Sequence, residues 1–555
     1  MLRKNDYVVL VSLLTLFTFV TLFVFRTADD NRLTSWQWVF SSVDAGRIFF
    51  ILVIGIFFSF LFSKRPFPEK NPAVVLFSIS FVISAFFWKE PELIVDASRY
   101  FTQAKHLEVY GTRYFFNEWG RDITAWTDMP VVPFFYGLIF RFIGESRSYI
   151  QVFTTFLFSV TVVLTYLTGK ELWNKDVGFA GGALLLGMPY LYTQTPLMLV
   201  DVPVMFLLTL SIYTSIKAMK YGGILMIVFS SITIFLTFYS KYSAWLMLSV
   251  LIIVFAVYIA RRDPKQYIYR AFMLALVSIS LAAVVIWLKF DVISEQISLL
   301  LSYQRPGLRR WGESFISTFL FQIHPFITLS AVYSFYVASR KKDMKYAIIS
   351  YLIVLVVLMQ IRRIRYIIMV LPMLSLMASY GLQEVRNVEL KRFVVLCIVV
   401  SSVIIALFAY LPFVQTISAV NLKEAGEYLD SIEASGVEVI TINTPNSEVN
   451  QAVSVPLLDI FTHKNIHYTH DEKFSPSIEK IKESPLRFTW EYKNPRYYLA
   501  NKEHLKGRAL VLILNEIDTP LPGFLAQKIR GCRKSKVFKT ADELFRHETV
   551  VTVYH

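Results

Sequence analysis

The sequence predicts a polytopic α-helical membrane protein that ends in a small soluble α/β domain. Of the 555 residues, 55% are hydrophobic and only 17% are charged. Apolar runs of about twenty residues, the length that a helix needs to cross a bilayer, recur up to residue 412. Beyond that point they give way to shorter helical and β-rich segments. Residues 1–412 are therefore predicted to form a membrane domain, and residues 413–555 a soluble domain.

About thirteen segments are predicted to cross the membrane, and the distribution of charge tests this number. They are residues 7–26, 46–63, 72–88, 149–168, 177–195, 197–216, 222–240, 244–260, 271–289, 314–338, 346–361, 366–383 and 393–412. Four clusters of Lys and Arg lie in short loops between them, at residues 64–70, 261–270, 340–345 and 386–392. With a cytoplasmic amino terminus, this count places all four clusters inside, as the positive-inside rule requires. Much of the formal net charge of +15 lies in these loops, so the charge does not indicate a nucleic-acid partner.

The longest polar interval before the soluble domain runs from Glu90 to Pro133, in a predicted extracytoplasmic loop at residues 89–148. Acidic residues alternate there with Trp, Tyr and Phe. A loop of this length between spans is more often functional than connective. It is therefore predicted to cap the active site of a membrane enzyme.

Two helices are predicted within this loop. Apolar residues recur at helical spacing over Leu93–Tyr110, and Gly111 suits the end of that helix. The helix is predicted to lie at the membrane surface, with Asp96 near its amino-terminal end. The segment Val131–Ile143 is apolar but too short to span, so we expect a re-entrant or interfacial helix.

The soluble domain, also predicted to be extracytoplasmic, has a mixed pattern. Residues 423–436, KEAGEYLDSIEASG, predict a helix that ends at a glycine. Three runs rich in β-branched and apolar residues predict strands: VEVITINTP, ALVLILNE and the closing ETVVTVYH.

Ionisable residues at the ends of membrane spans are costly to place there, so they are candidates for function. Asp201 lies between apolar neighbours at an outer span end, and Lys241 lies at an outer turn. Arg362, Arg363 and Arg365 also lie at an outer boundary, against the positive-inside trend of the other basic clusters. Arg pairs bidentately with phosphate and keeps its charge at low dielectric, so the triple indicates a phosphate partner.

The outer surface is thus predicted to combine carboxylates with cations. Carboxylates can deprotonate an acceptor hydroxyl, and cations can hold a phosphate leaving group. Simpler explanations remain open: Asp96 could cap its helix, Asp201 could mark a loop tip, and Lys241 and the arginines could reach lipid headgroups.

Several segments resemble those of the GT-C glycosyltransferases, membrane enzymes that depend on polyprenyl-phosphate sugars. DASRYFTQAKHLEVYG is similar to the Asp-led first-loop motif of that family, and WTDMPVVPFFYGLIFRFIGES to its proline-led segment. MPYLYTQTPLMLVDVPVMFLL, SKYSAWL and RRIRYIIMVLPMLSLMASYGL are similar to later segments. The resemblance is to the subgroup that contains the protein O-mannosyltransferases and the lipid A aminoarabinose transferases. Two additional predicted spans precede the first loop in this chain.

The resemblance implies a GT-C fold and transfer of a sugar from a polyprenyl phosphate to an acceptor hydroxyl on a protein, lipid or glycan, with inversion. It implies Asp96 as the base, with Asp201 orienting the acceptor or holding a divalent ion. The residues implied to bind substrate are Asp128, Lys241, Arg362, Arg363, Arg365 and Tyr366. No cofactor is expected, and no clear motif supports a divalent cation.

Two alternatives use the same residues. One is a transporter or flippase of a lipid-linked sugar, and the other is a ligase or polymerase that moves a whole glycan. Transporters often show internal pseudo-symmetry, whereas this sequence has no evident repeat and its charged candidates gather on one side. This asymmetry favours catalysis.

Overall fold

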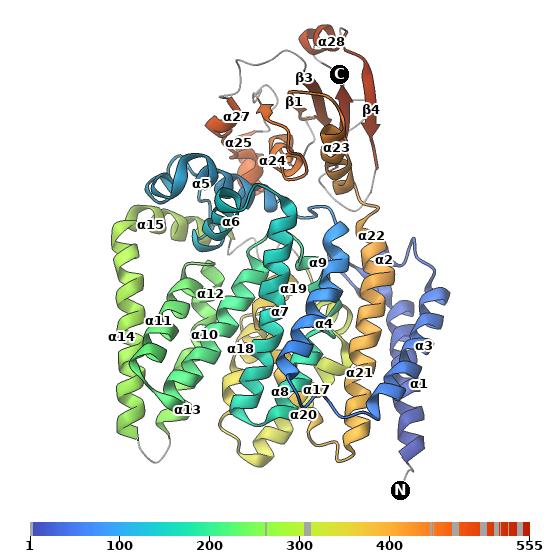
Figure 1. The fold of residues 1–555 in the computed structure, drawn as a ribbon, viewed down its shortest axis with the longest axis vertical. Coiled ribbons are helices and arrows are strands. Elements are labelled where there is room, and N and C mark those ends of the chain that lie inside the picture. Colours follow the sequence, from blue (N-terminus) through green and yellow to red (C-terminus); the bar gives the residue numbers. More distant parts are fainter. Residues whose placement is uncertain are drawn as a thin grey trace.

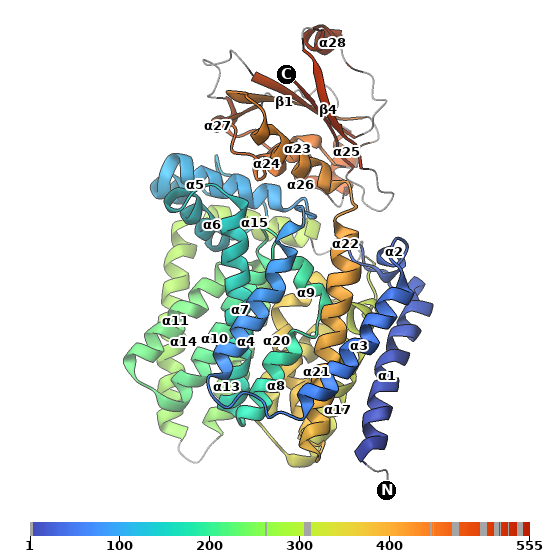
Figure 2. The same ribbon diagram turned by 45° about the vertical axis from the view of Figure 1, so that its right-hand side comes forward.

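A helical bundle with a five-stranded sheet above one end makes up the fold (Figure 1). The computed structural model describes residues 4–555 except 261–263, 305–311, 445–446, 448, 469–476, 485, 500–507, 516–520, 522, 531 and 541–547. The amino terminus lies at the opposite end of the bundle from the sheet, and both views show this separation (Figures 1 and 2).

Nine helical segments in the described part of the chain are long and apolar enough to cross a membrane. They are α1 (Lys4–Val24), α3 (Ala45–Ser63), α4 with η2 (Pro72–Ala85, Phe86–Lys89), α7 (Arg147–Leu172), α10 (Asp201–Tyr221), α12 with α13 (Tyr242–Met247, Val250–Ile259), α14 (Pro264–Leu288), α19 with η5 and α20 (Ile364–Ile367, Ile368–Val370, Leu371–Leu382), and α21 with η6 and α22 (Val388–Ile405, Ala406–Tyr410, Leu411–Val414). The predicted class of polytopic helical membrane protein is confirmed.

The other four predicted spans correspond to shorter helices within the bundle. These are α8 (Lys175–Leu185) with α9 (Pro189–Gln194), α11 (Ile224–Phe238), η4 (Ser317–Gln322) with α17 (Pro325–Lys341), and α18 (Tyr346–Leu358). Two of the segments are interrupted where a proline begins a new helix, at Pro189 and Pro325. Proline cannot donate the hydrogen bond that would continue the preceding helix, but it fits a first turn.

Short elements lie across the sheet-side end of the bundle. They are η1 (Arg26–Ala28), α2 (Trp36–Val39), α5 (Ala97–Glu118), α6 (Val131–Phe142), α15 (Phe290–Leu299) and η3 (Leu300–Gln304). The predicted short helix at Val131–Ile143 is confirmed as α6. Helix α5 begins at Ala97 rather than Leu93, and Gly111 bends it rather than ending it. Gly111 has a φ of 87°, which glycine adopts without strain, and the helix resumes beyond it.

The carboxy-terminal domain contains a sheet of order β2-β1-β3-β5-β4, in which β1 is parallel to both β2 and β3, and β5 is antiparallel to β3 and β4. Its elements are α23 (Ala419–Ser431), β1 (Gly436–Ile442), η7 (Gln451–Val453), α24 (Ser454–Asp459), β2 (Ile466–Tyr468), α25 (Ile478–Glu483), α26 (Arg487–Trp490), α27 (Arg496–Leu499), β3 (Arg508–Leu514), α28 (Gly523–Ile529), β4 (Lys534–Phe538) and β5 (Val550–Tyr554). The three predicted strands are β1, β3 and β5. The predicted helix is α23, which ends at Ser431, before the expected glycine.

The domain docks onto the loop at residues 89–148 through the half-buried Lys105. The ammonium of Lys105 in α5 lies 2.6 Å from a carboxylate oxygen of Asp459 in α24 and 2.8 Å from one of Glu145. The hydroxyl of Tyr498 also donates to Asp459, at 2.8 Å. Asp459 is buried, so its carboxylate would lose this cation if the domain moved away from α5, and the contact therefore favours a fixed arrangement.

Two arginines of the membrane domain extend this contact by stacking on aromatic rings of the soluble domain. The guanidinium of Arg99 lies 4.5 Å from the ring centre of Phe488, and that of Arg147 lies 5.1 Å from the ring centre of Phe461. These distances are in the range of cation–π attraction. The soluble domain therefore covers the first loop.

Candidate active site

Asp96 does not cap the helix that follows it. It occupies the N-cap position of α5, but its backbone is in the right-handed helical region and its side chain accepts no capping hydrogen bond. One carboxylate oxygen instead lies 2.6 Å from Nη1 of Arg365, at the start of α19. The simplest alternative for Asp96 is therefore wrong, and the side chain is directed to a residue nearly 270 positions away.

Asp201 completes a four-residue network with Arg365. Its Oδ2 accepts from Nε of Arg365 at 3.0 Å, and its Oδ1 lies 2.5 Å from the ammonium of Lys241. The side chain of Asp201 is only 2% exposed. Arg365 thus bridges two carboxylates, Asp96 and Asp201, which lie at the starts of α5 and α10.

Asp128 joins the network through Arg99. Nη2 of Arg99 lies 3.0 Å from Asp128 and 3.6 Å from Asp96. Asp128 also accepts from the hydroxyl of Tyr100 and the amide of Gln103, both at 3.3 Å. Asp128 is therefore held in place by three side chains of α5.

The two loop carboxyls differ in acidity. Burial alone would raise the pKa of Asp96, but the positive charges of Arg365 and Arg99 hold that pKa at about 2. For Asp128, burial outweighs the charge of Arg99, and the pKa is raised above its ordinary value. Asp96 is therefore the carboxylate that remains ionised throughout the physiological range.

The acid limb of the pH–rate profile should reveal this environment. Replacing Arg99 by glutamine removes one cation beside Asp96, so the pKa of Asp96 should rise. If Asp96 is the base, as the sequence resemblance implies, kcat/KM should fall at a higher pH than in the unmodified protein as the solution is acidified. Profiles measured from about pH 4 to pH 8 test this shift, with the exposed Arg121→Gln as the matched control. Identical acid limbs in both variants would refute this account of Asp96.

The three arginines of the outer cluster have different positions. Nε of Arg363 lies 3.2 Å from a carboxylate oxygen of the buried Glu313, and its guanidinium lies 5.4 Å from the ring centre of Tyr366. Arg362 is exposed, and its guanidinium donates to Gln360 at 2.9 Å. Arg363, Arg365 and Tyr366 line the same cavity as the carboxylates, whereas Arg362 is absent from its lining.

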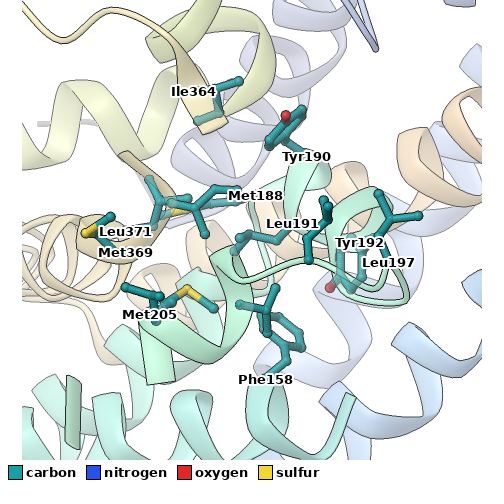
Figure 3. Close-up of a cluster of buried hydrophobic side chains, with 14 of the residues drawn as sticks. Phe158, Met188, Tyr190, Leu191, Tyr192, Leu197, Met205, Ile364, Met369 and Leu371 are labelled. Atoms are coloured by element: carbon teal, nitrogen blue, oxygen red, sulfur yellow. The ribbon is translucent and has the colours of Figure 1, made fainter. Parts of the chain in front are cut away.

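This cavity has a volume of about 940 Å³ and lies between the bundle and the soluble domain. Its lining includes Asp96, Asp128, Lys241 and Arg365. Asp201, which pairs with Lys241, is not part of the lining. Next to the cavity, α9, α10 and α19 with η5 pack together through a cluster of buried apolar side chains. Figure 3 shows this cluster, which includes Tyr190 and Ile364. The packing fixes the backbone from which Arg365 projects.

Several residues of this site were not predicted from the sequence. Arg99 could have been found, because it lies three residues after Asp96 on one helix face, where opposite charges pair. The buried pairs Glu92–Arg147, at 2.9 Å, and Glu313–Arg363 carry no local signal, because their members are far apart in sequence. Among the described residues, no group of three or more His, Cys, Asp or Glu side chains is arranged to hold a metal ion.

The geometry can be compared with known proteins. The apo crystal structure of ArnT from Cupriavidus metallidurans is similar over 86% of this chain and 97% of its own, with a TM-score of 0.54 at 8% sequence identity. The chain has the GT-C fold. The same ArnT bound to undecaprenyl phosphate is similar over 88% of this chain and 98% of its own, with a TM-score of 0.52 at 10% identity. Comparison with curated proteins gives no match.

A family model adds to the GT-C assignment. Residues 127–287 match the model for dolichyl-phosphate-mannose-protein mannosyltransferases. The matched segment contains Asp128, Asp201 and Lys241 of the site. The family model and the GT-C fold confirm the resemblance drawn from the sequence, and together they indicate a membrane glycosyltransferase.

Proposed function

We propose that this protein transfers a sugar from a polyprenyl phosphate to an acceptor hydroxyl on the extracytoplasmic face, with inversion at the anomeric carbon. The observation that carries this proposal is the sharing of buried Arg365, which lines the cavity, between Asp96 and Asp201. An ionised carboxylate and a phosphate-binding cation within one site are what such a transfer needs.

In the proposed reaction, the acceptor hydroxyl oxygen attacks the anomeric carbon from the face opposite the phosphate. Asp96 accepts the hydroxyl proton as the new carbon–oxygen bond forms. The bond between the anomeric carbon and the phosphate oxygen breaks, and its electron pair leaves with the polyprenyl phosphate. Phosphate departs without needing an acid, so no cofactor enters this scheme. Asp201 is absent from the cavity lining, and in this scheme it acts by holding Lys241 and Arg365 in position.

The cations stabilise the leaving phosphate. Arg365 is neutralised by the two carboxylates, and Lys241 by Asp201. A donor phosphate would compete with Asp96 for Arg365, and the pKa of Asp96 would then rise from its low value, which makes it a better base. Arg363 and Tyr366 line the cavity nearby and supply further donors to the phosphate. Since Arg362 is absent from the cavity lining, we do not propose it as a direct ligand.

The lipid part of the donor needs an apolar path. Leu246, Leu301 and Met359 line the cavity and are also exposed at the surface of the bundle. Their exposure on a membrane-embedded protein suits contact with an isoprenoid chain. ArnT of C. metallidurans, which shares the fold, has been crystallised with undecaprenyl phosphate. With a cytoplasmic amino terminus, the cavity and the soluble domain face outward.

Purified protein in lipid, supplied with undecaprenyl- and dolichyl-phosphate forms of mannose, glucose and a pentose, tests this function. We expect release of the free polyprenyl phosphate with at least one donor, together with transfer of its sugar. Movement of an intact lipid-linked sugar across vesicles, without release from any donor, would instead establish the transporter.

A further inference from the structure

The cavity extends well beyond the network around Arg365. On one side it is bounded by α12 and η3, and on the other by the loop between α1 and α3. Figure 1 shows α12 and α2, which belongs to that loop, on opposite sides of α19. The second side carries Thr27, Asp30, Arg32, Gln37 and Trp38 on the cavity lining. The apolar path for the donor lipid lies on the first side, so the second side is left for another substrate.

The buried carboxyl group of Asp29 fixes the shape of the loop on this second side, which is called the wall below. Asp29 is 2% exposed and accepts a hydrogen bond from the backbone N–H of Trp36 at 2.8 Å. It also accepts from the side chains of Ser317 at 2.5 Å and Gln322 at 2.8 Å. The indole of Trp36 donates in turn to the hydroxyl of Tyr410 at 3.1 Å. A loop held by this many buried hydrogen bonds presents its outer side chains in a defined arrangement.

The same wall is tied to the arginine segment. The carboxylate of Asp30 accepts from the backbone N–H of Ser314 at 2.9 Å, and the hydroxyl of Thr318 donates to the carbonyl of Arg362. Glu313, which pairs with Arg363, also accepts from the backbone N–H of Arg32. The wall and the proposed phosphate-binding cations are therefore parts of one hydrogen-bonded unit.

The wall recognises a ligand through side chains and not through its backbone. The backbone N–H groups of Asn31, Leu33, Thr34, Trp36 and Gln37 all donate to side chains of the loop itself. An extended peptide, which is commonly bound through main-chain hydrogen bonds, would find these five N–H donors already engaged. The wall offers the half-buried indole of Trp38, together with the exposed amide of Gln37 and the exposed carboxylate of Asp30.

From this placement we infer that the loop between α1 and α3 forms the acceptor subsite and that it takes a saccharide. Carboxylate and amide groups match sugar hydroxyls as acceptors and donors, and the face of Trp38 offers an apolar surface for the carbon–hydrogen side of a sugar ring. This inference rests on the proposed transfer reaction and names the class of its acceptor. It gives a substrate-binding role to the loop that joins the first two membrane spans.

Acceptor-dependent release of polyprenyl phosphate tests the assignment, with full-length protein, an active donor and three acceptor probes: mannotriose, chitotriose and a Ser/Thr-rich peptide. We expect a trisaccharide to stimulate release. In Trp38→Ala its KM should rise by at least about tenfold, because truncation of an aromatic anchor removes a large part of the binding. Trp38→Phe should recover much of the affinity, and the donor KM should stay within about twofold.

The control is Trp287→Ala, which removes an indole that is 80% exposed on α14, far from the loop. Stimulation by the peptide alone, an unchanged glycan KM in Trp38→Ala, or basal release that no probe stimulates would each overturn the saccharide subsite. Absence of release with every donor, with or without acceptor, would overturn the transfer reaction itself, so the two failures can be told apart.

Discussion

Asp96→Asn is expected to lower kcat by about 10²- to 10⁴-fold, the range that a positioned general base contributes. The amide is similar in size to the carboxylate but cannot accept the acceptor proton. Affinity for free polyprenyl phosphate should be kept or increased, because Arg365 would lose one of the two carboxylates that neutralise it. Single-turnover rates and phosphate-lipid binding, measured on the same preparation, separate the two effects.

The matched control for this variant is Asp122→Asn. Asp122 lies in the same loop, but its contacts are with Tyr114, at 3.1 Å, and with the largely exposed Arg496, at 3.3 Å. This variant makes the same change of charge outside the cavity lining, so turnover should be close to that of the unmodified protein. Full turnover in Asp96→Asn would remove Asp96 from the role of base.

Arg365→Gln is expected to be destabilising as well as inactive. The change leaves Asp96 without its closest cation and leaves Asp201 with Lys241 alone. Breaking a buried ion pair from one side typically costs about 3–5 kcal/mol. Thermal unfolding in detergent should therefore show a clear loss, and binding of polyprenyl phosphate should weaken. Arg365→Lys keeps the charge but not the two-sided geometry, so we expect partial recovery.

Arg362→Gln is the control from the same cluster, since Arg362 contacts the side chain of Gln360 and is absent from the cavity lining. Its effect on stability should stay within about 0.5 kcal/mol, as for most surface changes. A double variant, Arg365→Gln with Asp96→Asn, should recover part of the lost stability because the carboxylate that has lost its closest cation is also neutralised. Equal effects of the Arg362 and Arg365 variants would contradict the bridging geometry.

The membrane fold could be predicted because a span has a simple chemical signature. Runs of apolar residues identified the nine long helical segments and the four shorter ones, although Pro189 and Pro325 interrupt two of them, whereas α2 and α15 were not predicted. Loop elements were less predictable. The bend at Gly111 and the three-residue strand β2 depend on tertiary contacts, and short segments do not carry enough pattern to reveal them.

The site could be predicted as a set of residues but not as a set of pairs. Asp96, Asp201, Lys241 and Arg365 were each conspicuous as charges at membrane boundaries, and the structure brings them together. The roles within the arginine cluster were not visible, because only the fold shows which side of the turn faces the cavity. The amino-terminal loop was missed for a similar reason: its polar residues are ordinary until Asp29 is seen buried beneath them.

The position of the soluble domain over the first loop has a consequence for synthesis of the protein. Asp459 and Phe488, which contact Lys105 and Arg99, follow the last membrane helix in the chain. A nascent chain that has inserted all of its helices therefore still lacks the groups that cover the cavity. On the proposed orientation, the tail must cross the bilayer and fold before the site is enclosed. Maturation of the site thus coincides with the completion of translocation.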